Sequence, residues 1–168
     1  MVPASHSLLR VPIAPGELLD KITILEIKQT RLADPGQRAN VSVELSLLRQ
    51  ARTEALVEPM ELPPLVAELK MVNERLWDVE DALRQHEQDG DFGSGFIALA
   101  RSVYHLNDQR AFLKRRINEL CGSLLREEKS YRCSPNAAPS STPPVAEIPA
   151  TAPRPRTPSE DKEPKNAE

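Results

Sequence analysis

In residues 65–86, LVAELKMVNERLWDVEDALRQH, an apolar residue recurs at alternating spacings of four and three residues. This repeat is made by Leu65, Leu69, Val72, Leu76, Val79 and Leu83, with His86 at its end. Such spacing is typical of a long helix that packs against another helix along one seam. Pro63 and Pro64 stand just before the repeat, where proline fits the first turn of a helix. The stretch therefore predicts one long helix with one seam.

A second helix with the same repeat is predicted over residues 96–124. Its seam positions are Phe96, Leu99, Val103, Leu106, Arg110, Leu113, Ile117, Leu120 and Leu124. Arg110 alone among them is not apolar. The loop between the two helices, QDGDFGSG at 88–95, contains three glycines, which favour a turn. Helices joined by a short loop run antiparallel, so we expect the two seams to face each other.

Two further helices are predicted on the N-terminal side. Residues 17–32, ELLDKITILEIKQTRL, carry an apolar surface wider than one stripe, as expected of a helix at the centre of a bundle. The segment DPG at 34–36 is expected to end this helix. Another helix is predicted to start near Asn40, a good N-cap residue, and to weaken before Pro59. The predicted fold class is all-α: an antiparallel, coiled-coil-like helical bundle of about four helices.

The chain divides into three predicted parts. Residues 1–15 form an extended N-terminal segment, because the prolines of VPIAP at 11–15 disfavour a helix. Residues 16–131 form the helical bundle domain. Residues 132–168 hold nine of the sixteen prolines and no Leu, Phe or Trp, so they cannot bury enough apolar surface to fold. We expect a disordered, proline-rich tail there.

Charge and composition argue against several classes of protein. The net charge is −3 at pH 7, whereas nucleic-acid-binding proteins normally carry a basic excess, so no nucleic-acid partner is expected. The two cysteines and three histidines lack the spacing of metal ligands, and the glycines lack a phosphate-loop pattern, so we expect no metal and no cofactor. No apolar run has the length of a membrane span or a signal peptide, so cytoplasmic localisation is expected.

Four segments of the sequence together resemble a known family. They are PGELLDKITILEIK (15–28), LWDVEDALR (76–84), FIALARSVYHLNDQRAFLKRRIN (96–118) and GSLLREEKSY (122–131). They are similar to an uncharacterised bacterial protein family catalogued only as a domain of unknown function. The resemblance covers roughly residues 11–131 and implies that these segments form one unit. It implies no activity.

Eight residues are candidates for a binding site, because each places a polar or aromatic side chain beside an apolar helix face. They are Glu26, Asn73, Trp77, Glu80, Asn107, Arg110, Lys114 and Asn118. Burying polar groups costs free energy unless they are paired. One interpretation is a cleft that holds a small anion, because guanidinium and ammonium groups bind carboxylate and phosphate. The other is a polar network between helices that fixes their register.

Glu26 and Arg110 both interrupt apolar faces and carry opposite charges, so we expect them to pair between the first and the last helix. No nucleophile and base are spaced for a triad, and no catalytic residue is assigned. The leading hypothesis is a helical interaction or scaffold protein that self-associates, or binds a protein partner, through coiled-coil surface. The alternative is a small all-α enzyme or anion-binding module with an Arg-, Lys- and Glu-lined cleft. An enzyme is the less favoured class.

Overall fold

The computed structural model describes residues 9–126 and 128, and these residues form an all-α helical bundle. Its helices are α1 (Pro15–Arg31), α2 (Pro35–Ala55), α3 (Leu62–Asp89) and α4 (Ser94–Leu120). The described residues contain no strand. The all-α class predicted from the sequence is confirmed. The proline-rich tail predicted at 132–168 lies outside the described residues.

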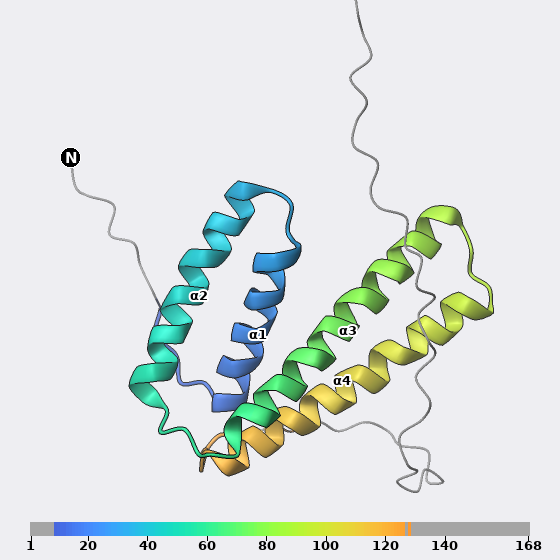
Figure 1. Ribbon diagram of the computed structural model, residues 1–168. Coiled ribbons are helices and arrows are strands. Elements are labelled where there is room, and N and C mark those ends of the chain that lie inside the picture. The colour runs from blue at the N-terminus through green and yellow to red at the C-terminus, as the bar shows by residue number, and fades with distance from the viewer. Residues whose placement is uncertain (1–8, 127, 129–168) are drawn as a thin grey trace, which may run out of the picture.

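The helices form two antiparallel hairpins that diverge from a common base (Figure 1). α1 and α2 make one hairpin, and α3 and α4 make the other. The N-terminal end of α1 and the C-terminal end of α4 both lie at the base. α1 packs against the other three helices, whereas the backbone of α2 approaches only α1. α1 therefore has the central position predicted from the sequence, and its broad apolar surface packs against the surrounding helices.

α2 begins at Pro35, so the predicted start near Asn40 is wrong. The side chain of Asp34 caps the helix, because its Oδ1 accepts a hydrogen bond from the Gln37 N–H at 2.7 Å. Pro35 occupies the first helical turn, where its missing N–H would have no partner in any case. The segment at 34–36 thus separates α1 from α2, as predicted, and also starts α2.

α4 ends at Leu120, so the prediction that its seam continues to Leu124 is wrong. Gly122 adopts the left-handed conformation, with φ of 64°. The Ser123 N–H donates to the Asn118 carbonyl at 2.8 Å, which closes a Schellman cap. Leu124 follows with 99% of its surface exposed. The left-handed turn at Gly122 therefore ends α4 about one turn before the apolar repeat of the sequence ends at Leu124.

The core lies where α1 packs against the α3–α4 hairpin. The largest fully buried side chains are Leu19, Ile22, Thr23, Ile27, Leu62, Leu69 and Ile117. The seam of α3 is buried from Leu65 to Val79, in agreement with the predicted register. Leu83 and His86, the last two seam positions, are only half-buried. The core therefore stops before the α3–α4 hairpin does.

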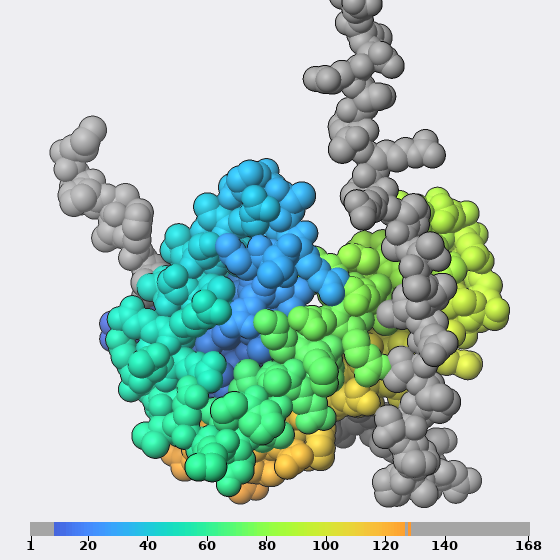
Figure 2. Space-filling model, viewed as in Figure 1, coloured from blue at the N-terminus to red at the C-terminus, as the bar shows by residue number. Residues whose placement is uncertain are grey.

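The remaining end of this hairpin forms an arm, which we define as residues 80–105. None of these residues is buried. The arm projects away from α1 and α2 (Figure 1), and the space-filling view shows its tip as a separate lobe (Figure 2). α1 ends at the root of the arm, where Arg31 pairs with Asp78 of α3. Of the four described helices, none therefore covers the seam of the arm from outside the hairpin.

Candidate functional site

One face of α1 carries small and polar side chains inside an otherwise apolar helix. Gly16, Asp20 and Thr23 follow each other at spacings of four and three residues, so they lie on the same side of the helix. All three are buried, and Asp20 has only 3% of its surface exposed. A carboxylate at this depth is stable only if it is paired and hydrogen-bonded.

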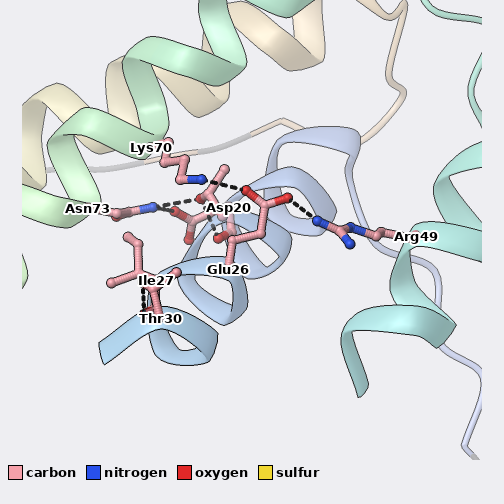
Figure 3. Close-up of polar contacts among 8 residues, drawn as sticks. Asp20, Glu26, Ile27, Thr30, Arg49, Lys70 and Asn73 are labelled. Atoms are coloured by element: carbon pink, nitrogen blue, oxygen red, sulfur yellow. Dashed lines mark hydrogen bonds and ion pairs between the residues drawn. The ribbon is translucent and has the colours of Figure 1, made fainter. Parts of the chain in front are cut away.

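Asp20 is paired with Arg110 of α4 through two parallel hydrogen bonds. The Nε of Arg110 donates to Oδ1 of Asp20 at 2.8 Å, and Nη2 donates to Oδ2 at 2.5 Å. The Nδ2 of Asn73 on α3 also donates to Oδ1 of Asp20, at 2.9 Å, and contacts Oγ1 of Thr23 at 3.0 Å. Figure 3 shows Asn73 reaching Asp20 from the facing helix. Asp20 therefore joins three helices.

The charged state of Arg110 is stabilised in this position. Hydrogen bonding to Asp20 raises the pKa of Arg110, and this outweighs burial, which acts in the opposite direction. The side chain of Arg110 is still 29% exposed, whereas that of Asp20 is 5% exposed. Two-pronged binding of a carboxylate by a guanidinium is among the strongest and most directional contacts in proteins. This pair fixes how α1 sits along α4.

Lys114 and Asn118 continue the contact between α4 and the start of α1. Lys114 is buried and pairs with Glu17. The backbone N–H of Gly16 donates to Oδ1 of Asn118 at 2.7 Å. α1 has no side-chain cap of its own at Ala14, so Asn118 satisfies one of the N–H groups that a helix start leaves without an intrahelical partner. We call Arg110, Lys114 and Asn118, with the α1 residues they contact, the polar row.

Gly16 lets the two helices approach closely at this end of the polar row. A Cβ at this position would lie 2.6 Å from the carbonyl oxygen of Lys114 and 2.9 Å from Oδ1 of Asn118. Only glycine fits such a distance without a backbone shift. The hydrogen bond from Gly16 to Asn118 depends on the same closeness.

The predicted pairing of Glu26 with Arg110 is wrong. Glu26 contacts Arg49 of α2 at 2.7 Å and Lys70 of α3 at 2.9 Å (Figure 3). Burial by itself raises the pKa of Glu26, but the hydrogen bonds from Arg49 and Lys70 outweigh it and hold the pKa below its ordinary value. Glu26 lies six residues after Asp20, which turns it by about 240° around α1. It therefore faces α2 and α3 instead of α4.

The other three candidates contact residues outside the polar row, and the charge of Glu80 adds, after Asp20 and Glu17, to the rise in the pKa of Arg110. Trp77 is half-buried, and the guanidinium of Arg31 lies 6.0 Å from its ring centroid. Glu80 is exposed and pairs with Arg84 at 3.3 Å. Asn107 donates from Nδ2 to the carbonyl of Val103 on its own helix at 3.0 Å. Of the eight candidates, Asn73 and Arg110 share a partner, because both donate hydrogen bonds to Asp20. Lys114 and Asn118 lie on the same helix as Arg110 and contact the start of α1.

Asp20 was missed by the sequence reasoning, because it is not among the eight candidates. A signal was available, because Gly16, Asp20 and Thr23 share a spacing and a face with Ile27, which is buried. A helix that is apolar on its other sides and central in the bundle buries this face too. An acid in such a position requires a basic partner.

A surface groove of about 490 Å³ lies at the C-terminal end of α4. It is lined by Arg115, Asn118, Glu119, Gly122, Ser123, Leu125, Arg126 and Glu128. Arg110 and Lys114 do not line it. Asn118 is 3% exposed, and its buried Nδ2 has no hydrogen-bond partner within the part of the chain that the structure describes. Asn118 therefore uses its oxygen on α1 and leaves a donor unsatisfied next to the groove.

Two further features concern only the described part of the chain. Within it, His, Cys, Asp and Glu side chains form no group of three or more that could hold a metal ion. None of the helices in residues 9–126 combines the length and apolar character that crossing a membrane requires.

Fold and site together define a small all-α bundle whose central helix is held by an internal ionic network. The chain belongs to DUF6165, a family of unknown function, whose model matches residues 9–146. This confirms the resemblance expected from the four sequence segments. No curated protein and no solved structure matches the chain.

Proposed function

We propose that this chain is a helical interaction module whose arm supplies the binding surface and whose partner is a second copy of the chain. The observation that carries the proposal is that no residue from 80 to 105 is buried, although the arm holds many large apolar side chains. Its seam residues Leu83, Phe96, Leu99 and Val103 are half-buried. Outside the seam, Phe92, Ile97 and Tyr104 are 54%, 48% and 52% exposed.

The reason lies in the geometry of a two-helix hairpin. Two helices shield each other along one line only, so the flanks of their seam stay open to water. At the root of the hairpin α1 closes one flank and ends at Arg31, which pairs with Asp78, and the arm projects away from it (Figure 1). Apolar area of the arm that a second copy covers leaves water, which stabilises the contact by about 25 cal/mol per Å². A second copy carries the same exposed apolar side chains and supplies this cover.

The polar row supports a structural role over an enzymatic one. Arg110 and Lys114, the cations expected to bind an anion, are paired with Asp20 and Glu17. A cation with a carboxylate already bound must break that contact before it can take a ligand. A scaffold function agrees with this use of the charges.

Analytical ultracentrifugation across a concentration series, combined with hydrogen–deuterium exchange, tests the proposal. We expect the mass to rise from monomer to dimer, and the amides of residues 80–105 to become protected as it does. Residues 35–55 of α2 are the internal control, because their protection should not depend on concentration. A chain that stays monomeric at its highest soluble concentration, with an arm that exchanges equally fast throughout, overturns self-association through the arm.

A second candidate function, anion binding, is favoured by the groove at the end of α4. The guanidinium group of Arg126 lines the groove, and so does Asn118, whose Nδ2 has no hydrogen-bond partner among the described residues. Thermal-shift measurements with citrate and inorganic phosphate test it. A rise in melting temperature that Arg126→Gln removes, and that the control Arg84→Gln, an exposed arginine of α3, retains, supports the candidate. No shift with either anion eliminates it for these ligand classes.

A further inference from the structure

The outward face of α4 carries a stripe of exposed side chains that lies opposite the seam. Its members are Ile97, Arg101, Tyr104, Asp108 and Phe112, at spacings of four, three, four and four residues. At about 100° per residue they fall within a narrow sector of the helix. Ile97, Tyr104 and Phe112 are 48%, 52% and 60% exposed, and Arg101 and Asp108 are exposed as well. We call these five residues the outer stripe.

The outer stripe matches itself when it is reversed. The midpoint between Tyr104 and His105 is also the midpoint between Arg101 and Asp108, and between Ile97 and Phe112. The charged residues lie about 5 Å on either side of this point along the helix, and the apolar ends about 11 Å. When a second outer stripe is laid antiparallel about this midpoint, Asp108 therefore lies opposite Arg101, and Phe112 lies opposite Ile97.

We infer that two copies of the chain associate through their outer stripes, with the α4 helices antiparallel and a two-fold axis beside Tyr104. This rests on the proposed self-association and specifies its interface, because Ile97, Arg101 and Tyr104 also belong to the arm. In a two-fold contact residue i meets residue j, and residue j meets residue i. Arg101 of each copy meets Asp108 of the other, and Ile97 meets Phe112.

Charge selects this arrangement over its alternatives. The whole chain carries a net charge of −3, so two copies repel unless opposite charges meet at the contact. In the antiparallel orientation two Arg101–Asp108 ion pairs form. In a parallel orientation Arg101 meets Arg101 and Asp108 meets Asp108, which is unfavourable. The aromatic rings of Tyr104 and His105, whose centroids are 4.3 Å apart within one copy, lie at the axis.

The interface is expected to be modest in strength. One helix pair buries less area than a typical permanent interface, so the dimer should exchange with monomer at accessible concentrations. This makes single charge changes measurable. Because Arg101 and Asp108 are exposed, replacing them should leave the bundle folded.

Charge reversal at the two positions tests the inference in solution. Arg101→Asp and Asp108→Arg should each weaken homodimerisation by about tenfold or more, because both ion pairs become like-charge contacts. Mixing the two variants should restore a dimer that contains one copy of each, since every contact then joins an acid to a base. Glu87→Arg, an exposed charge reversal on the arm away from the outer stripe, is the matched control and should dimerise like the parent.

The outcomes separate this inference from the proposed function. A parent chain that dimerises with a protected arm, while both variants dimerise unchanged or the mixture fails to associate, overturns the outer stripe as the interface and leaves the arm proposal standing. A parent that never dimerises overturns both. Circular dichroism of each variant confirms that the helices are intact.

Discussion

Asp20 is the residue of the polar row that binds side chains from two other helices. Its carboxylate receives the guanidinium of Arg110 and the amide of Asn73, which come from two different helices. Both contacts cross more than fifty positions of sequence. A buried charge that joins three helices in this way has a high cost when one partner is removed.

We therefore expect Asp20→Ala and Arg110→Ala each to lower the free energy of unfolding by about 3 to 5 kcal/mol, because the remaining charge is left unpaired. The double variant should lose less than the sum of the two, and urea denaturation of all four proteins measures this coupling. Glu26→Ala with Arg110→Ala is the control cycle and should be additive. Coupling in the control cycle, or additivity in the first, contradicts the assignment of partners.

At the level of residues, sequence reasoning found one side of the network and missed the other. Arg110 and Asn73 were found because Arg110 interrupts an apolar repeat and Asn73 borders one. Both features can be recognised in the sequence alone. The partner of Arg110 depends on the rotation of α1 about its axis in the bundle. Asp20 and Glu26 are both acids beside apolar residues, and the sequence alone does not say which of the two faces α4.

Among the helices, α2 shows how a short polar segment sets an element boundary. Asp34 holds the Gln37 N–H at 2.7 Å, in the exposed turn between α1 and α2. We expect Asp34→Ala to destabilise the protein by about 1 kcal/mol, the usual effect of losing an N-cap side chain. Asp34→Ser, which keeps an acceptor oxygen, should lose much less. Equal denaturation midpoints for Asp34→Ala and the parent would show that the cap contributes nothing.

The pairing of helices could be predicted, and the helix ends could not. Regular apolar spacing in α3 and α4 determines their seam, and the glycine loop determines that they run antiparallel. Helix ends depend on individual capping contacts. Asn40 and Asp34 are both acceptable N-cap residues, and only the Asp34–Gln37 contact decides between them. Leu124 keeps the apolar spacing, yet the left-handed turn at Gly122 has already ended α4.

Glu26 makes the contact of α1 with α2 and α3 sensitive to pH. Its pKa is lower in the folded protein, so its ionised form stabilises the fold above the unfolded-state pKa and the contribution is lost as pH falls through the folded-state value. We expect urea midpoints to fall between about pH 6 and pH 3, and Glu26→Gln to reduce this fall. Glu54→Gln, an exposed acid of α2, is the control. An unchanged slope in Glu26→Gln contradicts the role.

At the scale of the whole molecule, stability is concentrated at the base and declines along the α3–α4 hairpin. Leu76 and Leu83 belong to the same seam, seven residues or about two helical turns apart. Leu76 is 6% exposed, whereas Leu83 is half-buried. The seam of α3 is thus one continuous repeat in the sequence, but its residues are buried up to Val79 and only half-buried in the arm.

We expect Leu76→Ala to cost about 2 to 5 kcal/mol, the range for large-to-small changes in a packed core. Leu83→Ala should cost clearly less, because much of its side chain already contacts water in the monomer. Urea denaturation at low protein concentration measures both. Equal losses would mean that the core extends into the arm, contrary to the burial pattern.

The peripheral position of α2 has a practical consequence for labelling. Its backbone lies close to α1 alone, and Ser46 is exposed. Figure 1 places α2 on the side of the bundle away from α3 and α4. A fluorophore or an affinity handle attached through Ser46→Cys, in a chain with Cys121 and Cys133 replaced by serine, would therefore sit away from the polar row, the arm and the outer stripe. Energy transfer between two such labels could follow assembly in real time without a probe in the contact itself.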